Sequence, residues 1–154
     1  MDLQIFKEID LFRTLDPLHL AHLASIVTER RVAKDEIIFE EGDSAEEFYV
    51  IYRGRVRISK VVPGMGEEPL AVLNQGAYFG EMELVDRALP RVARATAHED
   101  CILQTFNFDA FDDLLKADKE LALAILWNMV RTLCQRLTET DNKVAATFAM
   151  AQFQ

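Results

Sequence analysis

Cysteine, glycine and proline are all scarce in this chain of 154 residues, which contains two, six and four of them respectively. Two cysteines cannot build a disulfide framework, and no Cys-X-X-Cys motif is present. Cys101 falls in a strand-like run and Cys134 in a helix-like run, so we expect two reduced, buried thiols in a cytoplasmic protein. The chain also lacks a Pro/Gly-rich linker, a low-complexity tract and an internal repeat, which favours a single domain.

Long hydrophobic runs and an excess of positive charge are missing too. No stretch of about 18 apolar residues is present, which excludes a membrane-spanning helix. The first ten residues, MDLQIFKEID, are acidic where a signal peptide would be basic. The formal net charge of −9 excludes nucleic acid as a direct partner, because binding to a phosphate backbone requires a basic face. A small anionic ligand is still possible, since it requires only a local positive pocket.

The hydrophobic pattern that is present indicates an α+β fold. Residues 1–28 are predicted to be helical, with apolar residues at helical spacing from Leu15 to Val27 and with Asp16 and Pro17 as a helix start. Residues 29–107 read as about eight short strands with glycines at the turns, which is typical of a sandwich, barrel or jelly roll.

Residues 108–154 are predicted to be helical again, as a short helix followed by a long one. Side chains along the long helix recur in alternating steps of four and three, at Leu126, Val130, Leu133, Leu137, Thr140, Val144 and Thr147. This is the spacing of a two-stranded coiled coil, and a helix of this length would overrun a domain of this size. We therefore expect a homodimer through the second half of the helix. The alternative is that the stripe packs only on its own β-domain.

The stretch GAYFGEMELVDRALPRVARATA, residues 76–97, places charges in an apolar setting. Gly80 permits close backbone approach, and a helical turn after it would leave free amides that attract an anion. Arg91, directly after Pro90, would complete a phosphate clamp. Glu81 is suited to accept hydrogen bonds from sugar hydroxyls, so the combination indicates a nucleotide. The alternative is that Glu81 and Arg91 simply neutralise each other as a buried pair.

Two motifs in this chain resemble those of cyclic nucleotide-binding domains, as found in catabolite activators and protein kinase A regulatory subunits. FGEMELVDRALPRVARA is similar to the family's phosphate-binding cassette, and EGDSAEEFYVIYRGRVRI is similar to its Gly-Asp hairpin motif. The resemblance covers nearly the whole chain. It implies N-terminal helices in residues 1–28, an eight-stranded antiparallel β-roll, jelly-roll-like, in 29–107, the cassette at 79–93, and the family's B and C helices in 108–154.

The resemblance also implies roles for individual residues. Arg91 would pair with the cyclic-phosphate oxygens, assisted by the backbone amides of Gly80, Met82 and Glu83, and Glu81 would accept the ribose 2′-hydroxyl. Val92 stands where relatives often carry a hydroxyl that can bond guanine, which favours cAMP over cGMP. The full set of expected ligand-binding residues is Phe79, Gly80, Glu81, Met82, Glu83, Pro90, Arg91, Val92, Val72, Leu73, Thr140 and Asp141.

Four members of this set lie outside the cassette. Val72 and Leu73 belong to the strand expected to line the pocket. Thr140 aligns with a helix threonine that contacts adenine in catabolite-activator relatives, and Asp141 is its neighbour. The alternative for Thr140 is a polar residue that fixes the register of a coiled coil.

Two residues depart from the family's pattern. Glu83 replaces the expected Ala or Gly, and its carboxylate would repel the ligand if it pointed inward. Arg94 is an additional cation that we expect to face solvent, where it could pair with Asp86 or Glu83.

Other candidate sites have simpler explanations. His19 and His22 lie three apart on a helix without a third ligand, so we expect a surface pair that holds no metal. A cupin-type metalloenzyme would need a set of histidine and carboxylate ligands within the strands, and the predicted strands lack such a set. No nucleophile–base arrangement is visible, so we expect neither a catalytic site nor a cofactor.

The sequence therefore predicts a cytoplasmic receptor for a cyclic nucleotide, with cAMP as the favoured ligand. Binding would draw the C-terminal helix over the pocket and change the dimer or a surface seen by a partner. The chain ends at Gln154, after the long helix, so we expect the output to be a separate effector protein. The alternative is a degenerate domain, marked by Glu83 and Val92, that binds no nucleotide and serves as a constitutive dimeric interaction module.

Overall fold

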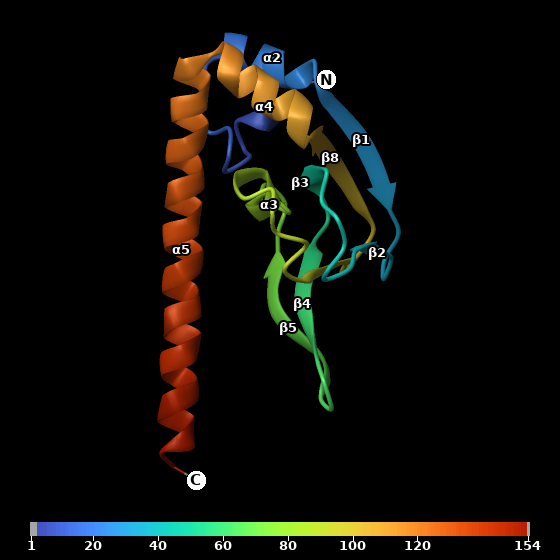
Figure 1. Cartoon of the computed structure of the whole chain (residues 1–154), viewed down its shortest axis with the longest axis vertical. Helices are drawn as coiled ribbons and strands as arrows, with labels where there is room; N and C mark the ends of the chain where they lie inside the picture. Colours follow the sequence, from blue (N-terminus) through green and yellow to red (C-terminus); the bar gives the residue numbers. More distant parts are fainter. Residues whose placement is uncertain (1–2, 154) are drawn as a thin grey trace.

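A computed structural model describes residues 3–153, which form two sheets, a group of short helices and one long helix (Figure 1). The elements in chain order are α1 (Leu3–Phe6), α2 (Pro17–Ala24), β1 (Val27–Val32), β2 (Ile37–Phe39), β3 (Glu47–Arg53), β4 (Val56–Val62), β5 (Gly66–Leu73), β6 (Tyr78–Phe79), α3 (Met82–Val85), β7 (Arg94–Ala97), β8 (Cys101–Asn107), α4 (Phe108–Ala117) and α5 (Lys119–Ala151). The predicted α+β fold with eight strands is confirmed within the described residues.

The strands form two four-stranded antiparallel sheets, in the orders β1-β8-β3-β6 and β2-β7-β4-β5. Alternate side chains of both sheets point inward and form one core, which includes Ile51, Val56, Ala95 and Leu103. A second core lies between the first sheet and the helices, where Phe48 stacks on Phe106 with ring centroids 5.1 Å apart. The aromatic and β-branched residues of β3 and β8 therefore join the roll to its helical cap.

The N-terminal helix is shorter than the leucine pattern predicts. Asp16 caps α2 as expected, since its carboxylate accepts a hydrogen bond from the backbone N–H of His19 at 2.8 Å, and Pro17 opens the helix. The expectation that Leu18 and Val27 continue an apolar helical face was wrong. Leu18 is exposed, and Val27 instead begins β1, where it pairs with Phe106.

His19 is also not the surface residue that the sequence suggested. It is buried, with Nδ1 3.3 Å from the Asp16 carboxylate and Nε2 3.1 Å from the carboxylate of Asp118. Asp118 caps α5 by accepting a hydrogen bond from the N–H of Leu121. The imidazole therefore connects the first turns of two helices, while His22 stays exposed.

The turns are set by glycines where the predicted hairpins require them. Gly54, between β3 and β4, has φ of +95°, which favours glycine. A Cβ atom on it would lie 2.6 Å from the carbonyl oxygen of Asp100. Gly54 therefore lets the β3–β4 hairpin pack against the turn between β7 and β8.

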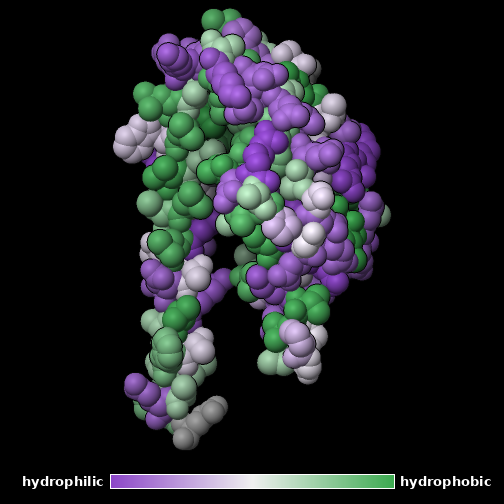
Figure 2. All heavy atoms as spheres, in the orientation of Figure 1, coloured by the Kyte–Doolittle hydropathy of each residue, from purple (hydrophilic) through white to green (hydrophobic). Residues whose placement is uncertain are grey.

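Helix α5 stands beside the roll as a long rod, and its second half extends past the packed part of the domain (Figure 1). Its buried face is confined to Leu121, Ile125, Asn128, Met129 and Thr132. The stripe of alternating steps four and three is exposed along its length, as shown by the row of apolar atoms on α5 in Figure 2. Thr140, Val144 and Thr147 nevertheless line a groove with Pro69 and Leu70 of β5, so dimerisation through the stripe and packing on the β-domain both stay predictions.

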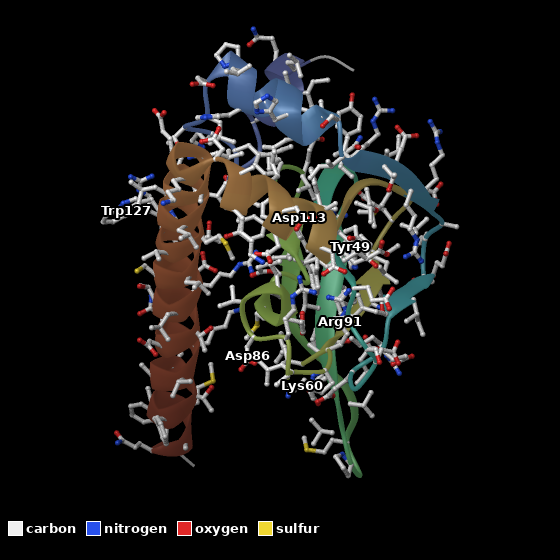
Figure 3. All side chains as sticks on the ribbon, turned by 45° about the horizontal axis from the view of Figure 1, so that its top comes forward. Tyr49, Lys60, Asp86, Arg91, Asp113 and Trp127 are labelled. Atoms are coloured by element: carbon white, nitrogen blue, oxygen red, sulfur yellow. The ribbon has the colours of Figure 1, made fainter. Side chains whose placement is uncertain are left out.

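Trp127 and Cys134, which also belong to α5, are exposed as well. Trp127 projects from the outer side of the helix in Figure 3, with 57% of its surface accessible. Cys134 is unpaired and exposed, which corrects the expectation of a buried thiol, whereas Cys101 is unpaired and buried. No helix in the described part of the chain combines the length and the apolar character needed to cross a bilayer.

Candidate functional site

A small cavity of about 160 Å³ lies between the roll and α5. Most of its lining is apolar, and its polar edge is formed by the segment between β6 and α3 together with one arginine of α5. The lining residues are Phe39, Ile58, Ala71, Leu73, Phe79, Gly80, Glu81, Met82, Glu83, Val92, Ala93 and Arg136. The structure thus brings the predicted cassette and the C-terminal helix to one cavity. Its volume is below the range of roughly 300–1,000 Å³ that is typical of ligand pockets.

Gly80 shapes the polar edge of this cavity. Its φ of +79° is favourable only for glycine, and a Cβ atom there would lie 2.8 Å from Nη1 of Arg91. The carbonyl oxygen of Gly80 accepts a hydrogen bond from the same nitrogen at 2.8 Å. The absence of a side chain therefore allows the Arg91 guanidinium to approach the backbone between β6 and α3.

Arg91 is held inside the roll, close to Tyr49 (Figure 3). Its Nη2 donates a hydrogen bond to the carbonyl oxygen of Glu47 at 2.5 Å, and its guanidinium carbon lies 4.1 Å from the ring centroid of Phe39. Its Nε has no hydrogen-bond partner among the described residues. The arginine is thus buried and positioned by backbone and aromatic contacts, and its Nε is left without a partner.

The carboxylate partner of Arg91 is Glu83. Both residues are 3% exposed, and Glu83 Oε2 lies 3.2 Å from Arg91 Nη1. This corrects the alternative in which Glu81 and Arg91 neutralise each other. The side chain of Glu83 points inward because α3 begins at Met82, after Glu81 as N-cap, and turns its second residue toward the roll.

Glu81 instead pairs with Arg136 of α5. Arg136 Nη1 lies 3.0 Å from Glu81 Oε1, and its Nη2 donates to the carbonyl oxygen of Tyr78. Burial raises the pKa of Glu81, and the nearby guanidinium of Arg136 opposes that shift. The carboxylate expected to meet a sugar hydroxyl is therefore already bonded to the C-terminal helix.

Sequence reasoning did not find Arg136. It lies one helical turn before Thr140, on a neighbouring part of the helix surface, so the i, i+4 spacing could have indicated it. Phe39, whose ring lies under the Arg91 guanidinium, was also missed, because its strand is far from the cassette in sequence.

Some of the other residues that were predicted to bind the ligand line the cavity, and others do not. Leu73 and Val92 line the cavity, as does Phe79, which is buried. Val72 does not, and its prediction was wrong because consecutive strand residues point to opposite faces, so that Ala71 and Leu73 face the cavity together. Met82 lines the cavity but is half-exposed, and Pro90 is exposed.

Thr140 and Asp141 are both exposed on α5. Thr140 lies beside a separate groove between α5 and β5, lined also by Pro69, Leu70 and Lys143 among others. The Thr140 hydroxyl donates to the carbonyl oxygen of Arg136 at 2.9 Å. The structure therefore does not bring Thr140 to the cavity that the cassette lines.

Arg94 pairs with neither Asp86 nor Glu83, contrary to the prediction. Its Nε lies 2.7 Å from Glu40 Oε2 and its Nη1 lies 3.7 Å from Glu67 Oε2. The reason is its position in β7: Glu40 directly follows the neighbouring strand β2, and Glu67 lies in β5, the strand beyond the other neighbour β4. Within residues 3–153, no group of three or more His, Cys, Asp or Glu side chains is arranged to hold a metal ion.

Comparison with known proteins agrees with this geometry. Residues 29–118 match the family model described as the cyclic nucleotide-binding domain. The chain is 33% identical to the cyclic AMP receptor protein of Thermus thermophilus, over 88% of this chain and 60% of that protein. It is also 33% identical to the cAMP-dependent protein kinase regulatory subunit of Mycosarcoma maydis, over 73% of this chain and 22% of that protein.

Solved structures show the same likeness. A cyclic nucleotide-binding domain from Methylobacillus flagellatus superposes with a TM-score of 0.83 at 26% identity, over 94% of this chain and 81% of that chain. The regulatory domain of Toxoplasma gondii PKA, solved with cAMP, gives a TM-score of 0.66 at 28% identity, over 73% of this chain and 42% of that chain.

The chain spans about 60% of the length of the receptor-type relatives that it matches from Thermus thermophilus and Mycobacterium tuberculosis. The family match covers more than half of this chain, and it includes both the Gly80–Glu83 segment, which lines the cavity, and Arg91, which bonds to Gly80 and Glu83. Fold, cassette and sequence agree, and the chain belongs to the cyclic nucleotide-binding domain family.

Proposed function

We propose that this chain is a receptor module for a cyclic nucleotide, with cAMP as the favoured ligand, and that it regulates rather than catalyses. The observation that carries the proposal is that the cassette residues Gly80–Glu83 and Val92 line one cavity with Arg136 of the long helix. The relatives that share the cassette are named as a cyclic AMP receptor and as kinase regulatory subunits, which supports a regulatory role.

In this proposal Arg91 binds the cyclic phosphate and Glu81 accepts the ribose 2′-hydroxyl. A guanidinium with a free Nε and a short contact to backbone is suited to a phosphate oxygen pair. Val92, which lines the cavity without a hydrogen-bonding group, favours adenine over guanine. No metal or cofactor takes part in this proposal.

The signal would pass through α5. Because Arg136 bonds one oxygen of the carboxylate that the ribose would use, binding of the ligand at Glu81 is coupled to the position of the helix. A ligand that binds the two arrangements of α5 with different affinity shifts their populations. We propose that the exposed stripe of α5 forms a homodimer, and that the change in α5 is read by a separate effector protein in the cytoplasm.

The test is calorimetric titration of the purified chain with cAMP and then cGMP, using Arg91→Ala and Arg91→Lys alongside. We expect binding by the unchanged chain, tighter for cAMP. Loss of a charge-assisted contact of roughly 1.5–3 kcal/mol should weaken binding by about tenfold to more than a hundredfold in Arg91→Ala. Arg91→Lys keeps the positive charge but loses the planar guanidinium that can bond two oxygens at once. Its affinity should therefore lie between those of the unchanged chain and Arg91→Ala.

The matched control is Arg55→Ala, which removes an arginine whose partner is the surface residue Glu99. Circular dichroism must first show that each variant is folded, because Arg91 is buried. Absence of binding to either nucleotide by the folded, unchanged chain would reject the receptor function.

One observation favours a second candidate, the constitutive dimeric interaction module without a ligand. Arg91 already has a buried carboxylate partner in Glu83, so the phosphate position is satisfied internally. This candidate predicts a dimer whose assembly and shape do not respond to either nucleotide, which sedimentation velocity with and without cAMP would reveal.

A further inference from the structure

Glu83 and Arg91 stand in an unusual relation to the cavity. Glu83 lines it, whereas Arg91 does not, and the Nη1 of Arg91 is bonded to two residues that do line it, at the Gly80 carbonyl and the Glu83 carboxylate. A ligand that enters the cavity therefore meets two buried carboxylates, Glu81 and Glu83, before it meets the arginine. An anion cannot reach Arg91 without moving Glu83.

The charges in the site also indicate that Glu83 must move before an anion can bind at Arg91. Arg91 and Glu83 together carry no net charge, and a cyclic phosphodiester carries one negative charge. Glu81 and Arg136 likewise balance each other, so if Glu83 stays in place a bound phosphodiester leaves three anions against two cations in the site, which is strongly unfavourable where water is excluded. If Glu83 leaves, one anion replaces another at Arg91 and the net charge of the site is unchanged.

The surroundings of Glu83 allow it to leave. Its helix α3 has only four residues, and its last residue Val85 and the residues that follow it, 86–90, are exposed. The cavity is also smaller than typical ligand pockets, and removal of the Glu83 carboxylate would extend it toward Arg91. A shift of α3 would thus both open the cavity and expose the clamp.

We propose that Glu83 is an internal competitor for the phosphate position, which sets the affinity of this pocket for cyclic nucleotides and makes binding depend on movement of α3. This inference rests on the receptor function proposed above. If the state with Glu83 displaced is populated at 0.1–10%, as is typical of minor states, the apparent affinity is reduced by about tenfold to a thousandfold.

The experiment is titration with cAMP of the unchanged chain, Glu83→Ala and Glu83→Gln. Alanine removes both the charge and the bulk of the competitor, and glutamine removes only the charge, so it protects the test against misfolding of the alanine variant. The control is Asp113→Ala, which removes an exposed carboxylate of α4. Melting temperatures with and without cAMP give a second readout.

We expect Glu83→Ala to bind cAMP at least about tenfold more tightly than the unchanged chain. The affinity of Glu83→Gln for cAMP should lie between these two, and that of Asp113→Ala should equal that of the unchanged chain. Without ligand the melting temperature of Glu83→Ala should fall, because Arg91 is left unpaired, and cAMP should raise it by more than in the unchanged chain. Binding that appears only in the Glu83 variants supports the proposal equally.

Two outcomes would overturn the inference, and they are distinguishable. If the unchanged chain binds cAMP and the Glu83 variants bind it equally or more weakly, Glu83 is not a competitor and the receptor function stands. If none of the folded proteins binds either nucleotide, the receptor function itself fails.

Discussion

Tyr49 shows how closely single side chains are coupled around Arg91. Its hydroxyl donates to the Glu47 carboxylate at 2.7 Å, and the carbonyl of Glu47 accepts from Arg91. Burial, reinforced by the hydrogen bond to Glu47 and the negative charge of that residue, raises the pKa of Tyr49 from 10.0 to about 12. The phenol next to the clamp therefore stays protonated when an ordinary tyrosine would ionise.

We predict that this shift makes the fold sensitive to alkali. The folded-state pKa lies above the unfolded one, so the contribution of Tyr49 to stability is fully present below pH 10.0 and is lost as the pH rises to about 12. Urea unfolding across this interval should show a steep loss of stability in the unchanged chain and a shallower loss in Tyr49→Phe. Tyr78, whose pKa is also raised by burial, remains in both proteins and accounts for part of the slope. Equal slopes would contradict the prediction.

At the scale of elements, Asn128 attaches α5 to the N-terminal segment. It is buried, and its amide nitrogen donates to the carbonyl of Leu11 and to the hydroxyl of Thr14, both at 2.9 Å. These bonds join residues more than a hundred positions apart in sequence. Asn128 thus adds a polar attachment to the apolar contacts that hold the base of the long helix.

We predict that Asn128→Ala destabilises the fold by about 1–3 kcal/mol, because the buried carbonyl of Leu11 loses its partner. Asn142→Ala removes the same side chain from an exposed position of the same helix, and should change stability by no more than about 0.5 kcal/mol. Urea denaturation of both variants and of the unchanged chain measures the difference. A similar loss in both variants would show that the effect is helix propensity and not the buried contact.

The elements were more predictable than their contacts. Asp16 before Pro17 and the glycine at 54 each carry a local signal, and the structure has the predicted helix cap and hairpin turn there. The pairing of Glu83 with Arg91 carried no such signal, because it depends on the direction in which α3 turns after Gly80. Arg136 carried only the indirect signal of its i, i+4 spacing to Thr140, since the sequence of a single long helix does not reveal which face meets the roll.

At the scale of the whole molecule, the exposed stripe of α5 leads to a prediction about assembly. Leu133 and Leu137 are 49% and 62% exposed, so a polar substitution there leaves the core of the monomer intact. In a coiled-coil dimer each would be buried against its counterpart, and a fully buried leucine contributes about 1.5–3 kcal/mol on each chain.

We therefore expect Leu137→Lys to be folded but monomeric in sedimentation velocity, at concentrations where the unchanged chain is a dimer. Glu139→Lys introduces the same side chain at an exposed position outside the stripe, and should remain a dimer. An unchanged chain that is monomeric at every concentration tested would reject dimerisation through α5.

The attachment of α5 at one end has a mechanical consequence. The helix has 33 residues, and its buried contacts end at Thr132, so that beyond this point Arg136 and the bond from Lys143 to the carbonyl of Leu70 hold it to the roll. The remaining arm of about 20 residues is about 30 Å long, so a tilt of about 5° at its base would displace its tip by about 2–3 Å. A rearrangement of the Glu81 side chain would in this way produce a larger displacement at the C-terminal end of α5, and the length of the arm would determine the size of that displacement.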